Sequence, residues 1–201
     1  MKSILMSIQP KYCELIASGK KTIEIRKTKP KLDTPFKVYI YCTKGDLALF
    51  RDDYDTEERY KYDVWKYAGF HQKCGDKTLL GGKVIGEFIC DYIEDFKEFE
   101  YGIDALHRHI KLNACIGYRE IYDYLGFSKC GYGWHISNLV IYDEPKEFFE
   151  FEKPCPSDSC GNCKYYYSGS LEEPPSCEWD DFELTRPPQS WCYVQESVLN
   201  I

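Results

Sequence analysis

The chain has 201 residues, 43% of them hydrophobic, and its 33 acidic and 26 basic side chains give a formal net charge of −7. This length predicts one domain with an appendage, and the negative charge excludes a general nucleic-acid coat protein. No run of residues approaches the length that crosses a bilayer, and the apolar run 3–8 is too short for a signal-peptide core. We therefore expect a cytoplasmic protein with no membrane partner.

The charge is distributed unevenly along the chain. Residues 1–45 carry a formal charge of +7, so the remainder carries −14. A basic segment on an acidic protein fits local contact with phosphate groups. It fits equally well with lysines that are solvated on a helix end and a loop, and the sequence leaves both interpretations open.

The first predicted helix covers residues 10–18. It has a proline in its first turn, and Gly19 suits the position that follows a helix end. The hydrophobic period then changes to two, which predicts a strand over 22–26. Its two isoleucines point to one face of this strand, and its Thr, Glu and Arg point to the other.

Three charged side chains, Lys21, Glu24 and Arg26, gather at this strand. Arg26 offers a fork of donors, Glu24 an acceptor and Lys21 a mobile cation, so the set predicts a site for a polar planar ligand. The alternative is a solvated ion pair of little energetic weight, because Glu and Arg two apart on a strand often pair and short charge patterns recur by chance.

The segment 46–80 mixes charged clusters with aromatic residues and is predicted to be an insert with a short helix over 60–67. After it, Gly81 and Gly82 predict a hairpin turn that leads into a strand over 83–93.

Two more helices are predicted over 104–109 and 118–125, the second with apolar residues at helical spacing and a glycine stop. His107 and His109 stand two apart, so they diverge on a helix and do not predict a metal pair. In the following apolar strand, Trp134 and His135 point to opposite faces. For Trp134 both base stacking and core packing fit the pattern.

The 11 cysteines form two sets. Those before residue 131 are scattered, and most are expected to be small buried hydrophobes. The tail contains a Cys-x2-Cys knuckle, Cys160-Gly161-Asn162-Cys163, and Cys177 and Cys192 supply two further ligands for one tetrahedral, structural zinc ion. Cys155 is a fifth candidate ligand, and free thiols or a disulfide are the alternatives, although cytoplasmic thiols stay reduced.

Three segments of the chain carry a family resemblance. The most specific runs from Ile8 to Arg26 and contains Gly19-Lys20-Lys21-Thr22-Ile23-Glu24-Ile25-Arg26. Weaker ones are Gly82–Phe88 and Gly131–Ile136 running into Leu139–Tyr142. Together they resemble the ASCH domain of the PUA-like superfamily. The resemblance implies an α+β fold, with a small β-barrel and flanking helices over 1–151. The cysteines predict that the remaining residues, 152–201, form a small zinc-binding tail.

This resemblance implies a cleft that binds RNA or a modified nucleobase, lined by the Gly-x-Lys-x-x-Glu-x-Arg motif. Lys21 and Arg26 are then expected to contact phosphate or base oxygens, Glu24 to accept from a base amino group, and Trp134 to stack on the base.

One branch of the family hydrolyses the acetyl amide of N4-acetylcytidine with a Lys, a Thr and a distant Glu. Lys21 matches the Lys, but Glu24 stands where that branch has its Thr, and Glu87 and Glu120 are the candidates for the distant Glu. A carboxylate does not replace a hydroxyl nucleophile, although it can act as a base toward water. We therefore rank binding above an amidohydrolase that uses Lys21 and Glu24.

The segment 186–193 is similar to a tail seen after ASCH domains in phage or prophage proteins of Gram-positive bacteria, and we expect Trp191 to dock it on the barrel. This similarity adds a third hypothesis, a module that engages a phage or host protein.

Overall fold

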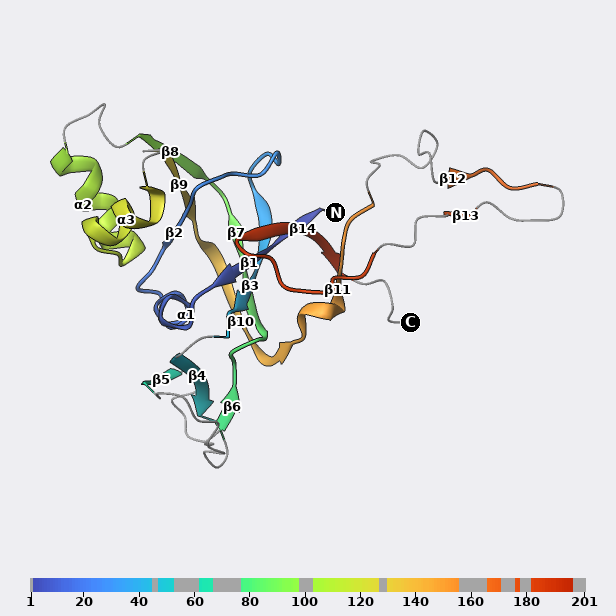
Figure 1. The fold of residues 1–201 in the computed structure, drawn as a ribbon, viewed down its shortest axis with the longest axis horizontal. Coiled ribbons are helices and arrows are strands. Elements are labelled where there is room, and N and C mark those ends of the chain that lie inside the picture. Colours follow the sequence, from blue (N-terminus) through green and yellow to red (C-terminus); the bar gives the residue numbers. More distant parts are fainter. Residues whose placement is uncertain are drawn as a thin grey trace.

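The computed structural model describes residues 2–44, 47–52, 62–66, 77–97, 103–126, 130–155, 166–170, 176–177 and 182–196. Its main element is a six-stranded sheet in which β1 and β3 are parallel and all other neighbours are antiparallel (Figure 1). In spatial order the strands are β10 (Ser137–Lys146), β7 (Val84–Cys90), β3 (Phe36–Cys42), β1 (Ser3–Ile8), β14 (Trp191–Glu196) and β11 (Phe151–Glu152).

A second, antiparallel sheet completes a half-barrel, which confirms the predicted α+β class. It contains β2 (Ile23–Arg26), β9 (Cys130–His135) and β8 (Ile93–Lys97). The helices are α1 (Pro10–Ala17), α2 (Ile103–Ala114), α3 (Tyr118–Leu125) and the short 3-10 turn η2 (Phe148–Glu150). In the described part of the chain, no helix combines the length and the apolar character needed to span a membrane.

Two smaller sheets lie outside the half-barrel. One consists of β5 (Tyr62–Lys66), β4 (Leu47–Asp52) and β6 (Lys77–Leu79), and the other of β12 (Tyr166–Tyr167) and β13 (Ser176–Cys177). The first sheet occupies the predicted insert, where the expected helix over 60–67 is wrong because β5 pairs with β4 there.

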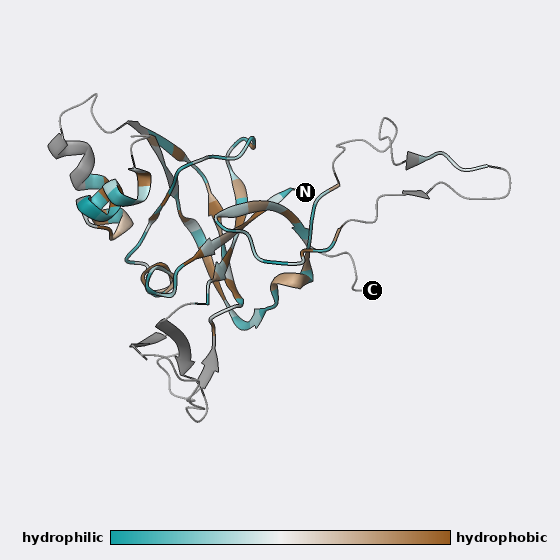
Figure 2. Cartoon of the chain, viewed as in Figure 1, coloured by the Kyte–Doolittle hydropathy of each residue, from teal (hydrophilic) through white to brown (hydrophobic). Residues whose placement is uncertain are grey.

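The centre of the main sheet is buried on both faces, so β1 is buried along its whole length, whereas the edge strand β10 is partly exposed. Ile4, Met6 and Ile8 point into a core with α1 and Trp134 of β9, whereas Leu5 points into a second core with Phe151. Hydrophobic positions recur along these central strands (Figure 2). Each fully buried side chain of this size contributes about 1.5–3 kcal/mol of transfer free energy.

The helix ends follow the predicted signals. Pro10 opens α1, and Gly19 follows its C-cap with φ of 71°, a left-handed conformation that glycine adopts without steric cost. The helix over 118–125 is confirmed, and α2 is longer than the predicted 104–109 because it continues to Ala114.

The expected strand over 83–93 is interrupted. It divides into β7 and β8, which belong to different sheets, so the chain bends from one sheet to the other after Cys90. The turn at Gly81–Gly82 is present, but it joins β6 to β7, which are not paired, and so it does not form a hairpin.

The last described strand returns to the half-barrel. β14 pairs with β1 on one side and with β11 on the other. With the predicted boundary at residue 151, β14 therefore belongs to the tail in sequence but to the main sheet in the structure. Trp191 at its start lies against Trp134, with ring centroids 5.9 Å apart, as expected for docking through Trp191.

Two phenylalanines of this region provide a matched test of the second core. Phe151 is 1% exposed and its ring lies 4.7 Å from that of Tyr39, whereas Phe149 is 58% exposed. We expect Phe151→Ala to lower the free energy of unfolding by about 3–5 kcal/mol and Phe149→Ala to change it by less than about 0.5 kcal/mol. Urea denaturation measures both, and equal effects would contradict an integral role for the chain beyond 150.

Candidate functional site

Lys21, Glu24 and Arg26 form one buried ion-pair network. Lys21 Nζ lies 3.2 Å from Glu24 Oε2, and Arg26 Nη2 lies 3.0 Å from Glu24 Oε1. Their side chains are 2%, 9% and 7% exposed, respectively. The structure therefore brings the three predicted residues together, but as a fixed and buried set in which Lys21 is not a mobile cation.

The strand geometry of β2 explains this burial. Ile23 and Ile25 pack against α2 and α3 in a third apolar cluster, so the alternate residues point to the opposite face, toward the interior of the half-barrel. Glu24 lies directly opposite Trp134 in the β2–β9 register, and cross-strand partners share a face of the sheet. The predicted alternation is confirmed, with its polar face turned inward.

Backbone and side-chain oxygens from distant segments hold both cations. Lys21 Nζ donates to Ala114 O at the end of α2 over 2.6 Å. Arg26 Nη2 donates to Ser7 O of β1 over 2.7 Å, and Nη1 to Ser190 Oγ, just before β14, over 3.4 Å. The network thus connects three parts of the fold, because buried charges are stable only when paired and hydrogen-bonded.

Several polar atoms in this network have hydrogen-bonding capacity left over. Among the described residues, Glu24 Oε2, Arg26 Nε and Trp134 Nε1 are buried and make no hydrogen bond, and the Lys21 contact to Glu24 Oε2 lacks hydrogen-bond geometry. A buried polar atom without a hydrogen-bond partner costs about 1–3 kcal/mol. These atoms are therefore suited to accept a ligand that provides the missing partners.

Aromatic side chains surround the charges. Lys21 Nζ lies 4.8 Å from the Tyr12 ring centroid, and Trp134 packs edge-on to Phe36 at 5.6 Å. Tyr124 of α3 reaches Arg26, and its burial raises the pKa of the phenol, an effect that the Arg26 charge partly offsets. Trp134 is fully buried, so the less buried rings beside the network are Tyr12, Tyr124 and Trp191.

The sequence did not single out Tyr12 or Tyr124 for this site. Tyr12 stands in the first turns of α1, and only the tertiary fold brings its ring to Lys21. A thiol also lies close by: burial, reinforced by the neighbouring Cys42, raises the pKa of Cys13 well above its ordinary value, so Cys13 is present here as a neutral group.

Neither candidate for the distant Glu joins the network in the described structure. Glu87 makes an ion pair with Lys37 at 2.8 Å and accepts from Tyr142 Oη at 2.5 Å. Burial acts to raise the Glu87 pKa, but these two partners outweigh it and hold the pKa below its ordinary value. Glu120 is exposed, pairs with Lys11 at 3.0 Å and accepts from the Gly117 N–H that begins α3.

The predicted zinc ligands are only partly described. Cys160 and Cys163 lie outside the described residues, and Cys177 stands in β13 opposite Tyr166. Cys192 stands in β14 and packs against the second core, where burial raises the pKa of its thiol to about 11. Cys155 is partly buried.

A comparison with protein-family models identifies the family of this chain. The model of the ASCH domain family matches residues 6–154. Among solved structures, ASCH from Zymomonas mobilis is 15% identical with a TM-score of 0.47, over 96% of this chain and 87% of that one. Two point mutants of the same protein give 15% identity with TM-scores of 0.48 and 0.46, over 97% and 96% of this chain and 91% and 88% of theirs. No curated protein matches the chain.

The central carboxylate of the network is testable through stability. In Glu24→Gln the shape remains, but two buried cations lose their counter-charge, so we expect the free energy of unfolding to fall by about 3–5 kcal/mol. The matched control is Glu120→Gln, whose exposed pair with Lys11 is worth at most about 1 kcal/mol. Denaturation curves of the two variants check this, and a Glu24→Gln protein as stable as its control would show that the network is not electrostatically coupled.

Proposed function

The chain belongs to the ASCH domain family, and from this premise we propose that it binds RNA or a modified nucleobase or nucleoside at the Lys21–Glu24–Arg26 network. One observation carries this proposal: a carboxylate and two cations meet inside the domain with unused hydrogen-bonding atoms and are bordered by aromatic rings. A stability role alone does not require the unused atoms.

The chemistry of the network suits a nucleobase. Glu24 accepts hydrogen bonds from an exocyclic amino group, as carboxylates do from cytosine. Arg26 still has Nε to offer to a base carbonyl or a phosphate oxygen. The three charges sum to +1, so the network favours a neutral or anionic ligand over a cationic one.

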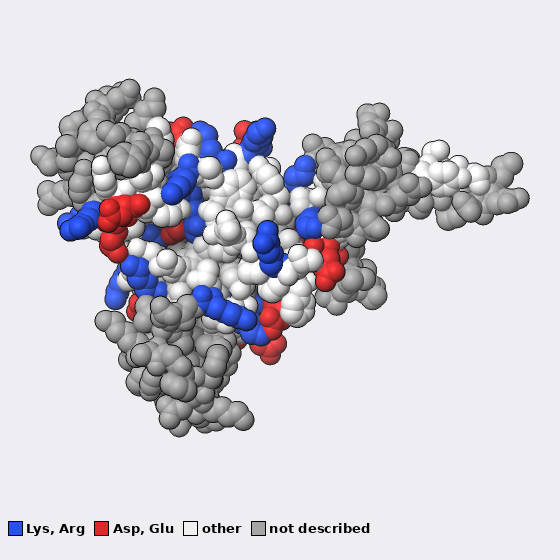
Figure 3. Space-filling model, viewed as in Figure 1, with Lys and Arg blue, Asp and Glu red and all other residues white. Residues whose placement is uncertain are grey.

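Exposed lysines accompany the aromatic residues around the network. Lys11 Nζ lies 4.5 Å from the Tyr12 ring centroid, and Lys27 Nζ lies 5.2 Å from that of Tyr124. In the view of Figure 3, the residues drawn in colour include more Lys and Arg than Asp and Glu. Alternating cations and rings are the elements that hold a single-stranded backbone and stack its bases.

Because the Glu24 side chain is 9% exposed, a base can reach it only after neighbouring side chains move. We propose Trp191 as the ring that moves: it is partly exposed, packs against Trp134 and Tyr193, and donates from Nε1 to Thr28 Oγ1 over 3.1 Å. Trp134 itself stays in the core, so the stacking role that the sequence suggested for Trp134 passes in this proposal to Trp191.

The second candidate function is an amidohydrolase acting on an N4-acetylcytidine-like nucleoside. The 3.2 Å contact between Lys21 Nζ and Glu24 Oε2 favours it, because a carboxylate beside an ammonium group can deprotonate water while the cation stabilises the oxyanion. This mechanism differs from one with a hydroxyl nucleophile, since water attacks directly. The third candidate is a module for a phage or host protein, supported by the charge of −14 outside residues 1–45.

One experiment separates the three candidates. Purified protein is incubated with cellular RNA and a panel of modified nucleosides, and both retained species and products are identified by mass spectrometry. Arg26→Lys keeps the buried positive charge but loses the planar fork, so it should remain folded while its affinity falls at least about fivefold. The matched control is Lys20→Ala, an exposed neighbour of Lys21 whose loss should change affinity by no more than about twofold.

If the wild type retains a species and Arg26→Lys retains less of it, the result supports binding at the network and identifies the ligand. Turnover that disappears in Lys21→Met establishes the amidohydrolase. If Arg26→Lys and the wild type retain equal amounts of RNA, the proposed site is contradicted. If the protein neither retains nor converts any species, the result favours the third candidate, binding to a protein partner.

We also propose that the cysteine-rich tail binds one structural zinc ion, in a cytoplasm that keeps its thiols reduced. The β12–β13 pairing supports this, because it places Cys177 opposite Tyr166, and Cys163 precedes Tyr166 by three residues, within about 11 Å along an extended chain. The fourth ligand is Cys192 or Cys155. Burial opposes the thiolate form at Cys192, and Cys155 is partly buried.

Metal analysis of protein purified without chelator checks the tail site. We expect the zinc content to fall by about one equivalent in Cys160→Ser and in one of Cys155→Ser and Cys192→Ser. A protein whose zinc content is zero, or is unchanged in Cys160→Ser, contradicts the proposal.

A further inference from the structure

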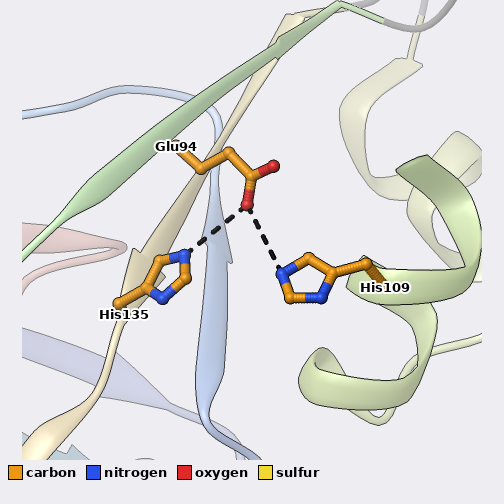
Figure 4. Close-up of side chains that lie close together, drawn as sticks. All are labelled: Glu94, His109 and His135. Carbon is orange, nitrogen blue, oxygen red and sulfur yellow. Dashed lines mark ion pairs between the residues drawn. The ribbon is translucent and has the colours of Figure 1, made fainter. Parts of the chain in front are cut away.

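A second cluster of metal-ligating side chains lies away from the buried network. Glu94 of β8, His109 of α2 and His135 of β9 point toward one another (Figure 4). His135 Nε2 lies 3.5 Å and His109 Nε2 3.9 Å from the same oxygen, Glu94 Oε2. One donor atom from each residue lies within 4.8 Å of the other two.

We propose that this cluster is a binding site for a divalent transition-metal ion of the zinc class. Two imidazole nitrogens and one carboxylate oxygen form a ligand set that such ions favour, whereas Ca²⁺ and Mg²⁺ require oxygen ligands. Three protein ligands leave one tetrahedral position for water or another small ligand.

The spacing of the donor atoms fits such an ion. Metal–ligand bonds of 2.0–2.1 Å in a tetrahedron put the donor atoms about 3.3 Å apart. The two separations from Glu94 Oε2, 3.5 and 3.9 Å, are somewhat longer than this value, and all donor atoms lie within 4.8 Å of one another. Rotation of the side chains shortens such separations.

The backbone that carries the ligands is held by packing. In the β8–β9 pairing Glu94 lies opposite Gly133, and His135 N donates to Tyr92 O, so Glu94 and His135 are diagonal neighbours. On α2, Ile110 follows His109 directly and is buried in the third apolar cluster, which fixes the helix against β2. A site on rigid elements binds without a large ordering cost.

The donor atom of His135 supports the assignment. His135 Nε2 is shielded from solvent and makes no hydrogen bond among the described residues, and its ring is held edge-on by Tyr92 at 5.1 Å. A shielded imidazole nitrogen without a hydrogen-bond partner is costly unless a ligand occupies it.

The other ring nitrogen of His109 also has a neighbour. His109 Nδ1 lies 3.0 Å from the Asn113 side-chain amide, which also donates to His109 O over 2.9 Å. A metal on Nε2 leaves the proton on Nδ1, and the amide then presents its oxygen by rotating, giving up the bond to His109 O. This exchange orients the ring and moderates the affinity.

The site shares no donor atom with the Lys21 network or with the tail cysteines, so its metal binding can be measured separately. Its test is therefore a titration of the untagged full-length protein with Co²⁺, whose visible spectrum distinguishes ligand types. To keep thiolates of the knuckle from competing, the titration uses a Cys160→Ser, Cys163→Ser background.

We expect one equivalent of Co²⁺ to bind with d–d bands and without a thiolate-to-cobalt charge-transfer band. His109→Ala removes an exposed side chain and should weaken binding at least about 100-fold, as should Glu94→Gln. The matched controls are Lys111→Ala on the same helix and Asp95→Asn on the same strand, which should bind as the background does.

The proposal is overturned by any of three results: no binding of Co²⁺, binding with a thiolate charge-transfer band alone, or binding that is unchanged in His109→Ala and Glu94→Gln. Circular dichroism of the His109→Ala and Glu94→Gln proteins is the control for folding: we expect both spectra to match that of the background, so that loss of the metal reports on the ligands.

Discussion

Burial of the Glu24 carboxylate between two cations is the constraint on which the half-barrel depends. β2 has apolar residues on its helix-facing side, so its polar side must point inward, where an unpaired charge is far more costly than at the surface. Lys21 and Arg26 neutralise Glu24, and each cation needs further acceptors in turn. Ala114 O, Ser7 O and Ser190 Oγ supply them. The network therefore fixes α2, β1 and the approach to β14 around one point.

A buried ion-pair network contributes little net stability to a core. Replacing buried ion pairs with well-packed apolar side chains is often neutral or stabilising, whereas breaking one pair costs several kcal/mol. The unused capacity of Glu24 Oε2 and Arg26 Nε adds to that cost. If the network served only to fix the register of β2, paired charges would be explained. The buried atoms without a hydrogen-bond partner, Glu24 Oε2 and Arg26 Nε, would not be. Ligand recognition accounts for both, because strained or unsatisfied groups concentrate where proteins bind.

The parts of the fold that the sequence predicts are those with local signals. Helix α1 is bounded by Pro10 and Gly19, and the alternation of β2 is visible in four residues. The helix expected over 60–67 failed because its aromatic spacing fits either period, and pairing with β4, a non-local contact, selects the strand. Burial of the polar face of β2, the return of β14 to β1, and the meeting of Tyr12 with Lys21 depend on tertiary packing. The approach of His109 to Glu94 and His135 also depends on tertiary packing, because the three residues come from different elements.

The last turn of α2 physically connects the two clusters. Asn113 contacts the His109 ring through its side chain, and its carbonyl accepts from Thr22 N at the start of β2. Its neighbour Ala114 supplies the carbonyl that Lys21 requires. A metal ion that holds His109 against β8 and β9 therefore restrains the same turn that positions Lys21. If ordering of this turn favours a ligand at the network, linkage requires that the ligand favour the metal by the same factor. The coupling passes through one helix turn that reaches both clusters by hydrogen bonds of Asn113 and Ala114.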